Sequence, residues 1–145
     1  MITRDVLIIG GGAAGSSAAF HLATAGHKVT LIEKRDLSSI KPCGGGMASS
    51  VQKWFPFDLR PAIDEVIHRV DFSWFLKDKV QAVLPGSEPF WIVNREKFDA
   101  YLLKQAVSAG TELLNPVSVT DVNKLKETWQ ITCNNGKQLE ARSLI

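Results

Sequence analysis

The first hydrophobic positions of the chain gather in two four-residue runs, Val6–Ile9 and Val29–Ile32. Short, nearly continuous apolar runs are typical of strands that are buried on both faces of a parallel sheet. The residues between the runs are mostly small, and we expect Ala14, Ala18 and Ala19 to face the sheet from a helix. The pattern therefore predicts a strand–helix–strand unit of about 30 residues.

From Val66 to Val93 apolar and polar residues alternate, which is typical of strands with one buried face. The predicted strands are Val66–Lys77, Lys79–Leu84 and Phe90–Val93, with a corner at Asp78 and a turn at Pro85-Gly86. We expect them to form one small antiparallel sheet, preceded by a short amphipathic helix from Ala48 to Trp54.

Aromatic side chains recur along these strands. They can line an apolar pocket or fill a core, and their strand-like spacing favours the core. The residues concerned are Phe72, Trp74, Phe75, Phe90 and Trp91.

The last third of the chain predicts a helix followed by short strands. Asn94 is a suitable N-cap for a helix from Arg95 to Ala109, which Gly110 ends. A buried strand over Thr111–Leu114 follows. A three-stranded meander is then predicted over Val117–Leu125, Trp129–Cys133 and Gln138–Arg142, with a hairpin turn at Asn135-Gly136.

Composition narrows the class of protein. The chain has 145 residues, of which 45% are hydrophobic and 22% charged, as in globular domains. Its net charge is only +2, without a basic run, so we expect no nucleic-acid partner. Two distant cysteines and three isolated histidines predict neither a disulfide framework nor a metal site. No targeting segment is recognisable, and a cytoplasmic location is the default expectation.

The glycines after the first run carry the first chemical signal. Gly10-x-Gly12-x-x-Gly15 provides a tight turn, a close backbone approach to a pyrophosphate, and close packing of helix on strand. Glu33 follows the second strand, where an acid can accept hydrogen bonds from ribose hydroxyls. A glycine-rich turn without a ligand is the alternative interpretation, and the surrounding pattern favours the dinucleotide site.

A second glycine run, Gly44-Gly45-Gly46, follows Pro42 and Cys43. Adjacent glycines are usually kept where the backbone passes very close to another group. A thiol beside them would face the same group. A flexible hinge with an inert Cys43 is the alternative.

Taken in order, these motifs resemble the geranylgeranyl reductase family of FAD-dependent oxidoreductases. The resemblance rests on Gly10-x-Gly12-x-x-Gly15, Glu33-Lys34, Lys41-Pro42-Cys43-Gly44-Gly45-Gly46 and Arg95-x-x-Phe98-Asp99-x-x-Leu102. It implies an α/β, Rossmann-like FAD-binding domain of the glutathione-reductase type, with a β-meander and part of an antiparallel substrate-side sheet. In this interpretation residues 1–47 and 94–145 form the nucleotide-binding core and residues 48–93 form an insertion.

The same resemblance implies which residues bind FAD. The glycine loop would hold the pyrophosphate, Glu33 the adenosine ribose, and Cys43-Gly44-x-Gly46 would pass alongside the flavin, with Cys43 as a candidate catalytic residue. Arg95 would reach the cofactor, and the Val119 backbone would meet the adenine. The full set of expected cofactor contacts is Gly10, Gly12, Ala13, Ala14, Gly15, Glu33, Lys34, Cys43, Gly44, Gly46, Arg95 and Val119.

The implied activity is reduction of double bonds in an isoprenoid-like, apolar substrate. Because no second glycine fingerprint is present, the electron donor would be external, such as NAD(P)H or a reduced ferredoxin. A lipid substrate would also imply peripheral membrane contact. The alternatives are an FAD-dependent monooxygenase or halogenase, and a nucleotide-binding module without chemistry of its own.

Family members are longer than this chain, and Leu144-Ile145 resembles the start of a further strand. We therefore expect the 145 residues to be the N-terminal portion of a longer protein, and inactive alone.

Overall fold

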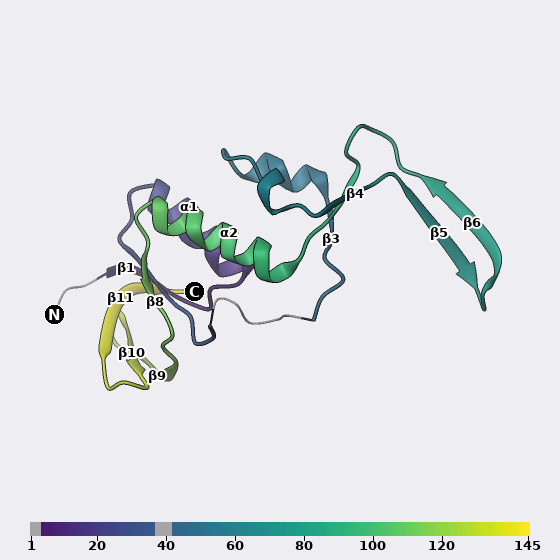
Figure 1. The fold of residues 1–145 in the computed structure, drawn as a ribbon. Helices are drawn as coiled ribbons and strands as arrows, with labels where there is room; N and C mark the ends of the chain where they lie inside the picture. The colour runs from purple at the N-terminus through teal and green to yellow at the C-terminus, as the bar shows by residue number, and fades with distance from the viewer. Residues whose placement is uncertain (1–3, 37–41) are drawn as a thin grey trace. The chain divides into compact units, whose positions relative to one another are not determined.

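The computed structural model describes residues 4–36 and 42–145 (Figure 1). The chain divides into two compact units, one built from residues 1–39 and 99–145 and the other from residues 40–98. The second unit is thus inserted between two halves of the first along the sequence.

The first unit is organised around a six-stranded sheet in which parallel and antiparallel pairs meet. Its strands, in spatial order, are β8 (Glu112–Leu114), β2 (Val29–Ile32), β1 (Arg4–Ile9), β11 (Gln138–Leu144), β10 (Trp129–Cys133) and β9 (Val119–Lys124). The first four strands are parallel to their neighbours, whereas β9, β10 and β11 form the antiparallel meander seen together in Figure 1. This arrangement confirms the predicted α/β fold with a β-meander.

Strand β11 belongs to both parts of this sheet. Its first residues pair with β10, and Val6 and Leu7 of β1 pair with Ser143 and Leu144. Ile145 continues the ladder, because its N–H donates to the Leu7 carbonyl at 2.9 Å. The expectation that Leu144-Ile145 begins a separate strand was therefore wrong: Leu144 lies in β11, and Ile145 continues the pairing of β11 with β1.

Helix α1 (Ala13–Thr24) packs on β1 and β2. Ser16, Ala19 and Phe20 are its buried residues, whereas Ala14 is exposed. The prediction that Ala14 faces the sheet was wrong, because helical spacing from Ala19 and Ser16 turns that position outward. On the sheet, the central core contains Leu7, Ile32, Ile131, Cys133, Leu139 and Ala141.

Helix α2 (Arg95–Ser108) begins in the second unit and continues into the first. The Asn94 side-chain oxygen accepts hydrogen bonds from the N–H groups of Glu96 (2.9 Å) and Lys97 (3.4 Å), which makes it the expected N-cap. The helix stops before Gly110, whose φ of +107° suits glycine. Both predicted ends of this helix are confirmed to within one residue.

The second unit contains two small antiparallel sheets instead of the one expected. In the three-stranded sheet, β7 (Phe90–Ile92) lies between β3 (Gly46–Ala48) and β4 (Glu65–Ile67). The separate hairpin joins β5 (Arg69–Trp74) to β6 (Lys77–Val83). Two 3-10 helices, η1 (Ser49–Trp54) and η2 (Arg60–Ala62), complete the unit, η1 standing where an amphipathic helix was predicted.

The predicted long strand over residues 66–77 is interrupted at His68, which separates β4 from β5. The corner lies at Phe75-Leu76 instead of Asp78, because Trp74 pairs with Lys77 and closes a two-residue turn. Phe75 and Leu76 have φ values of 48° and 61°, a left-handed geometry that usually requires glycine or asparagine.

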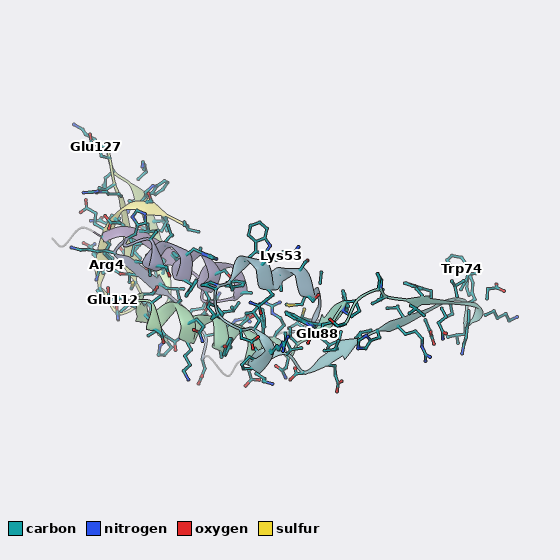
Figure 2. All side chains as sticks on the ribbon, turned by 90° about the horizontal axis from the view of Figure 1, so that it is seen from above. Arg4, Lys53, Trp74, Glu88, Glu112 and Glu127 are labelled. Atoms are coloured by element: carbon teal, nitrogen blue, oxygen red, sulfur yellow. The ribbon has the colours of Figure 1, made fainter. Side chains whose placement is uncertain are left out.

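The aromatic side chains of the hairpin neither fill a core nor line a pocket, the two roles expected from the sequence. Trp91 is buried in the three-stranded sheet, but Phe72, Trp74 and Phe75 are 59%, 72% and 81% exposed. Figure 2 shows Trp74 at the far end of the β5–β6 hairpin. Among the described residues, no helix is long and apolar enough to cross a membrane.

Candidate nucleotide-binding site

The first unit places the end of β1 directly against the start of α1. A Cβ added to Gly15 would lie 1.9 Å from the Gly10 carbonyl oxygen and 3.3 Å from Ile8 Cγ2, so any side chain there is excluded. Gly10 has a φ of +110°, and its N–H donates to the Ile32 carbonyl at 2.8 Å. The first and third glycines thus perform the turning and packing roles that the sequence predicted.

The N-terminus of α1 is open to an anion. Gly12 occupies the N-cap position in an extended conformation, so no side chain caps the helix, and the first turn holds no acidic residue. Free N–H groups and the positive end of the helix dipole therefore remain unneutralised by the helix's own side chains. Such an end stabilises a bound phosphate.

Glu33, the first residue after β2, reaches back to this loop. One carboxylate oxygen accepts a hydrogen bond from the Gly11 N–H at 2.6 Å, and the other accepts one from the Arg35 N–H at 2.7 Å. A Cβ on Gly11 would lie 3.1 Å from the Glu33 Cβ, so a side chain there would make Glu33 shift by a few tenths of an ångström. A carboxylate offers about four lone-pair positions, so Glu33 can still accept hydrogen bonds from a ligand.

A pocket of about 320 Å³ adjoins this glutamate. Its lining residues are Ile9, Gly10, Ile32, Glu33, Lys34, Val117 and Val119. The structure therefore brings together four of the predicted contacts, namely Gly10, Glu33, Lys34 and Val119, although they are more than 100 positions apart at the extremes. A volume near the lower end of the range for ligand pockets suits one part of a dinucleotide.

Sequence analysis missed the segment that closes this pocket. The Asn115 side-chain amide donates to the carbonyl oxygens of Glu33 (3.0 Å) and Arg35 (2.6 Å), and the Val117 N–H donates to the Glu33 carbonyl at 2.9 Å. These bonds hold the chain after β8 beside Glu33. The only sequence signal was an asparagine after a predicted strand, and it did not reveal the partner 80 residues away.

Gly12, Ala13, Ala14 and Gly15 lie at the start of α1 in the first unit, whereas the contacts assigned to the flavin, Cys43, Gly44, Gly46 and Arg95, lie in the second unit. Gly45 has a φ of +71°, and a Cβ on it would lie 2.0 Å from the Val93 carbonyl oxygen. A Cβ on Gly46 would lie 2.9 Å from the Phe90 ring, whereas one on Gly44 would meet nothing within 4 Å. The close approach predicted from the glycine run is thus made by Gly45 and Gly46 to β7 and its end. Gly44 alone has open space for a ligand.

Cys43 is exposed, and its sulfur accepts a weak hydrogen bond from the Gly45 N–H at 3.4 Å. Lys41, the first residue of the same motif, lies outside the described residues. The Gly45 carbonyl accepts a hydrogen bond from the Val93 N–H at 3.0 Å, two residues before Arg95. The two segments that the resemblance assigns to the flavin are therefore joined within one unit.

Other polar groups have structural roles. At the amino ends of the parallel strands, Glu112 accepts hydrogen bonds from Arg4 (2.8 Å) and Thr30 (2.7 Å), which links β1, β2 and β8 (Figure 2). Partial burial raises the pKa of Glu112, but the hydrogen bonds from Thr30 and Arg4 outweigh this effect and place the pKa below its ordinary value.

The buried Cys133 lies in the core of the sheet, where burial raises the pKa of its thiol. Among the described residues, no cluster of His, Cys, Asp and Glu could hold a metal ion.

Comparison with known proteins agrees with this geometry. Residues 5–49, which contain the glycine loop and Glu33, match the model of a family described as FAD dependent oxidoreductase. A geranylgeranyl bacteriochlorophyll reductase-like structure from Thermoplasma acidophilum superimposes with a TM-score of 0.84 at 26% identity, over 97% of this chain and 37% of that one. Residues 5–49 thus carry the sequence pattern of FAD-dependent oxidoreductases, and the fold of the chain is similar to that of a geranylgeranyl reductase-like structure.

Two curated relatives are similar to most of this chain. A digeranylgeranylglycerophospholipid reductase from Picrophilus torridus is 38% identical over 120 residues, 77% of this chain and 30% of its own length. A thiamine thiazole synthase from Saccharolobus solfataricus is 32% identical over 121 residues, 83% of this chain and 40% of its own length. The chain spans about a third of the length of these relatives.

The fold extends further among FAD-dependent oxidoreductases. A crystal structure of the halogenase PltM in complex with phloroglucinol and FAD has a TM-score of 0.79 at 17% identity, covering 97% of this chain and 33% of that one. This likeness concerns the fold alone. It shows that the fold of this chain also occurs in a halogenase whose crystal structure contains FAD.

Proposed function

We propose that this chain binds FAD and that the protein reduces double bonds of an isoprenoid-like, apolar substrate. The observation that carries the FAD part is the hydrogen bond between Glu33 and the glycine loop, which lies between a pocket lined by Gly10 and Glu33 and the uncapped start of α1. The substrate part is supported by similarity to the digeranylgeranylglycerophospholipid reductase and to the geranylgeranyl reductase-like structure.

The residues present fit the ADP half of FAD. The open N-terminus of α1, together with Gly12, Ala13 and Ala14, would receive the pyrophosphate, because among the described residues no side chain caps this helix and no acid lies in its first turn. Glu33 would accept the ribose hydroxyls with its remaining lone pairs. Lys34 and the Val119 backbone line the same pocket and would bound the adenosine.

In the second unit, Cys43, Gly44, Gly46 and Arg95 would contact the flavin half. Gly44 offers open backbone, and Arg95 would place a permanent positive charge near the cofactor. Bound FAD supplies hydride transfer once it has been reduced. The task of the chain is to hold the cofactor in a fixed position and to adjust its electronic properties.

The proposed partners follow from this chemistry. The substrate is a small or lipid-linked prenyl chain, and a lipid substrate would bring the protein into peripheral contact with a membrane. The chain has one dinucleotide fingerprint, which FAD would occupy, so the electron donor is a separate molecule such as NAD(P)H or a reduced ferredoxin. We also propose a cytoplasmic location, which is the default expectation from the sequence.

The test is to purify the full-length protein and record its visible absorption for bound flavin. Reduction by NAD(P)H, ferredoxin or dithionite, followed by mass spectrometry of a geranylgeranyl lipid, would show saturation of double bonds. Substrate-stimulated oxygen consumption without saturation would favour the monooxygenase or halogenase alternative. Tight FAD binding without turnover would favour a nucleotide-binding module, and Gly12→Val protein serves as the FAD-deficient control.

A further inference from the structure

Asp64 holds the segment that leads into α2. Its carboxylate accepts a hydrogen bond from the backbone N–H of Asn94, and its other oxygen lies 3.1 Å from the Lys97 ammonium. Its own N–H donates to the Ile92 carbonyl at 2.9 Å. One residue therefore binds the end of β7, the N-cap and the first turn of α2, on both sides of Arg95.

The opposite side of the same segment is held by Gly45. The Val93 N–H donates to the Gly45 carbonyl at 3.0 Å, and the Cβ-free Gly45 allows the Val93 carbonyl to approach closely. Val93 and Asn94 are thus fixed from two directions, by the glycine run and by Asp64. All of these residues lie in the second unit.

Asp64 is not needed to start the helix. Asn94 already caps α2 with its own side chain, which accepts the Glu96 N–H at 2.9 Å. The hydrogen bond from Asp64 adds a constraint on the Asn94 backbone, the peptide unit that precedes Arg95. Hydrogen bonds from Lys97 and from the Asn94 N–H lower the pKa of Asp64, so its carboxylate is ionised at neutral pH.

We infer that Asp64 is a positioning residue for Arg95: by fixing Asn94 and the first turn of α2, it sets the direction from which the Arg95 guanidinium meets the flavin half of FAD. This inference rests on the proposed function, because it needs Arg95 to contact the cofactor. At metal sites, loss of a group that hydrogen-bonds and orients a ligand typically costs about 10–100-fold in affinity, and we expect an effect of the same kind here.

The experiment is a double-mutant cycle on FAD affinity in the full-length protein. Apoprotein of the wild type, Asp64→Ala, Arg95→Ala and the double variant is titrated with FAD, and the visible spectrum of bound flavin is recorded. We expect Asp64→Ala to weaken FAD by about tenfold and to shift the flavin spectrum. In the Arg95→Ala background, Asp64→Ala should have no further effect on FAD affinity.

Two further variants separate positioning from folding. Lys97→Gln removes the ion pair but leaves Asp64 bound to the Asn94 N–H, so we expect FAD affinity to change less than about threefold. Asp64→Asn retains a carbonyl acceptor, and we expect it to recover much of the affinity that Asp64→Ala loses. It also provides a well-folded comparison if Asp64→Ala lowers the melting temperature.

Each contrary outcome is distinct. Independent, multiplicative losses from Asp64→Ala and Arg95→Ala would overturn the inference and leave Asp64 a purely structural residue. Unchanged FAD affinity in Arg95→Ala protein, with Glu33→Ala still defective, would also overturn it while leaving FAD binding itself intact. A wild-type protein that binds no FAD would instead overturn the proposed function.

Discussion

The carboxylate of Glu33 and the backbone N–H of Gly11 lie 2.6 Å apart, so the acid at the end of β2 is bonded to the middle of the glycine loop. An acid expected only to bind a ribose therefore also fixes the loop that would receive the pyrophosphate. The two halves of the proposed ADP site are coupled through one side chain.

Replacing Glu33 tests this coupling. Glu33→Ala removes the acceptor of two backbone N–H groups and of the proposed ribose hydroxyls, and we expect FAD binding to weaken by about 1–3 kcal/mol. Glu33→Gln keeps one carbonyl oxygen and should lose less. Titration of each apoprotein with FAD measures the effect, and equal affinities for all three proteins would contradict it.

Gly15 and Gly12 should fail in different ways. Gly15→Ala forces a Cβ against the Gly10 carbonyl, and we expect it to cost at least about 1–3 kcal/mol of stability and to lose FAD. Gly12 has φ −73° and ψ −175°, which valine can adopt, so Gly12→Val should fold but bind no FAD. Thermal unfolding and flavin content distinguish the two, and a wild-type flavin content in Gly12→Val protein would reject the pyrophosphate assignment.

The second glycine run offers a matched pair. Gly45→Ala combines a left-handed φ with a clash against the Val93 carbonyl, so it should lower the melting temperature. Gly44→Ala meets nothing among the described residues and should leave the melting temperature unchanged. If Gly44 borders the flavin, its alanine variant nevertheless weakens FAD, and unchanged binding would remove Gly44 from the site.

Glu112 predicts a dependence of stability on pH. Its pKa in the folded chain lies below the ordinary value of 4.5, so its contribution is complete above about pH 4.5 and is lost as the pH falls through the lower, folded pKa. Wild-type protein should therefore lose stability on acidification more steeply than Glu112→Gln protein. Urea unfolding at several pH values measures this, with Arg4→Met to complete a double-mutant cycle; parallel pH curves would contradict the assignment.

The hairpin turn at Phe75-Leu76 should tolerate a more favourable sequence. Both residues are left-handed and highly exposed, and each such conformation costs about 1–2 kcal/mol for an ordinary side chain. Replacing the pair with Asn-Gly should stabilise the hairpin and reduce self-association. Thermal unfolding and size-exclusion chromatography test this. A lower melting temperature of the Asn-Gly variant would show that Phe75 and Leu76 do not adopt the left-handed turn described above.

A feature of this structure could be predicted from the sequence when the residues that determine it lie close together along the chain. The glycine loop, Glu33 and the ends of α2 could be predicted because turns and caps are decided by residues a few positions apart. The break at His68 and the Phe75-Leu76 turn could not, since pairing between strands overrides their local preferences. Asp64 and Asn115 were missed for the same reason: Asp64 acts on Asn94, 30 positions away, and Asn115 on Glu33, 82 away.

The double pairing of β11 has a consequence for synthesis on the ribosome. Strand β1 is made first, yet one of its two neighbours is β11, which ends at residue 144. At usual elongation rates that edge of β1 stays unpaired for on the order of ten seconds, while the rest of the 145 residues emerges. During that interval the nascent chain presents an apolar strand edge, open to chaperones or to a neighbouring nascent chain, until β11 pairs with it.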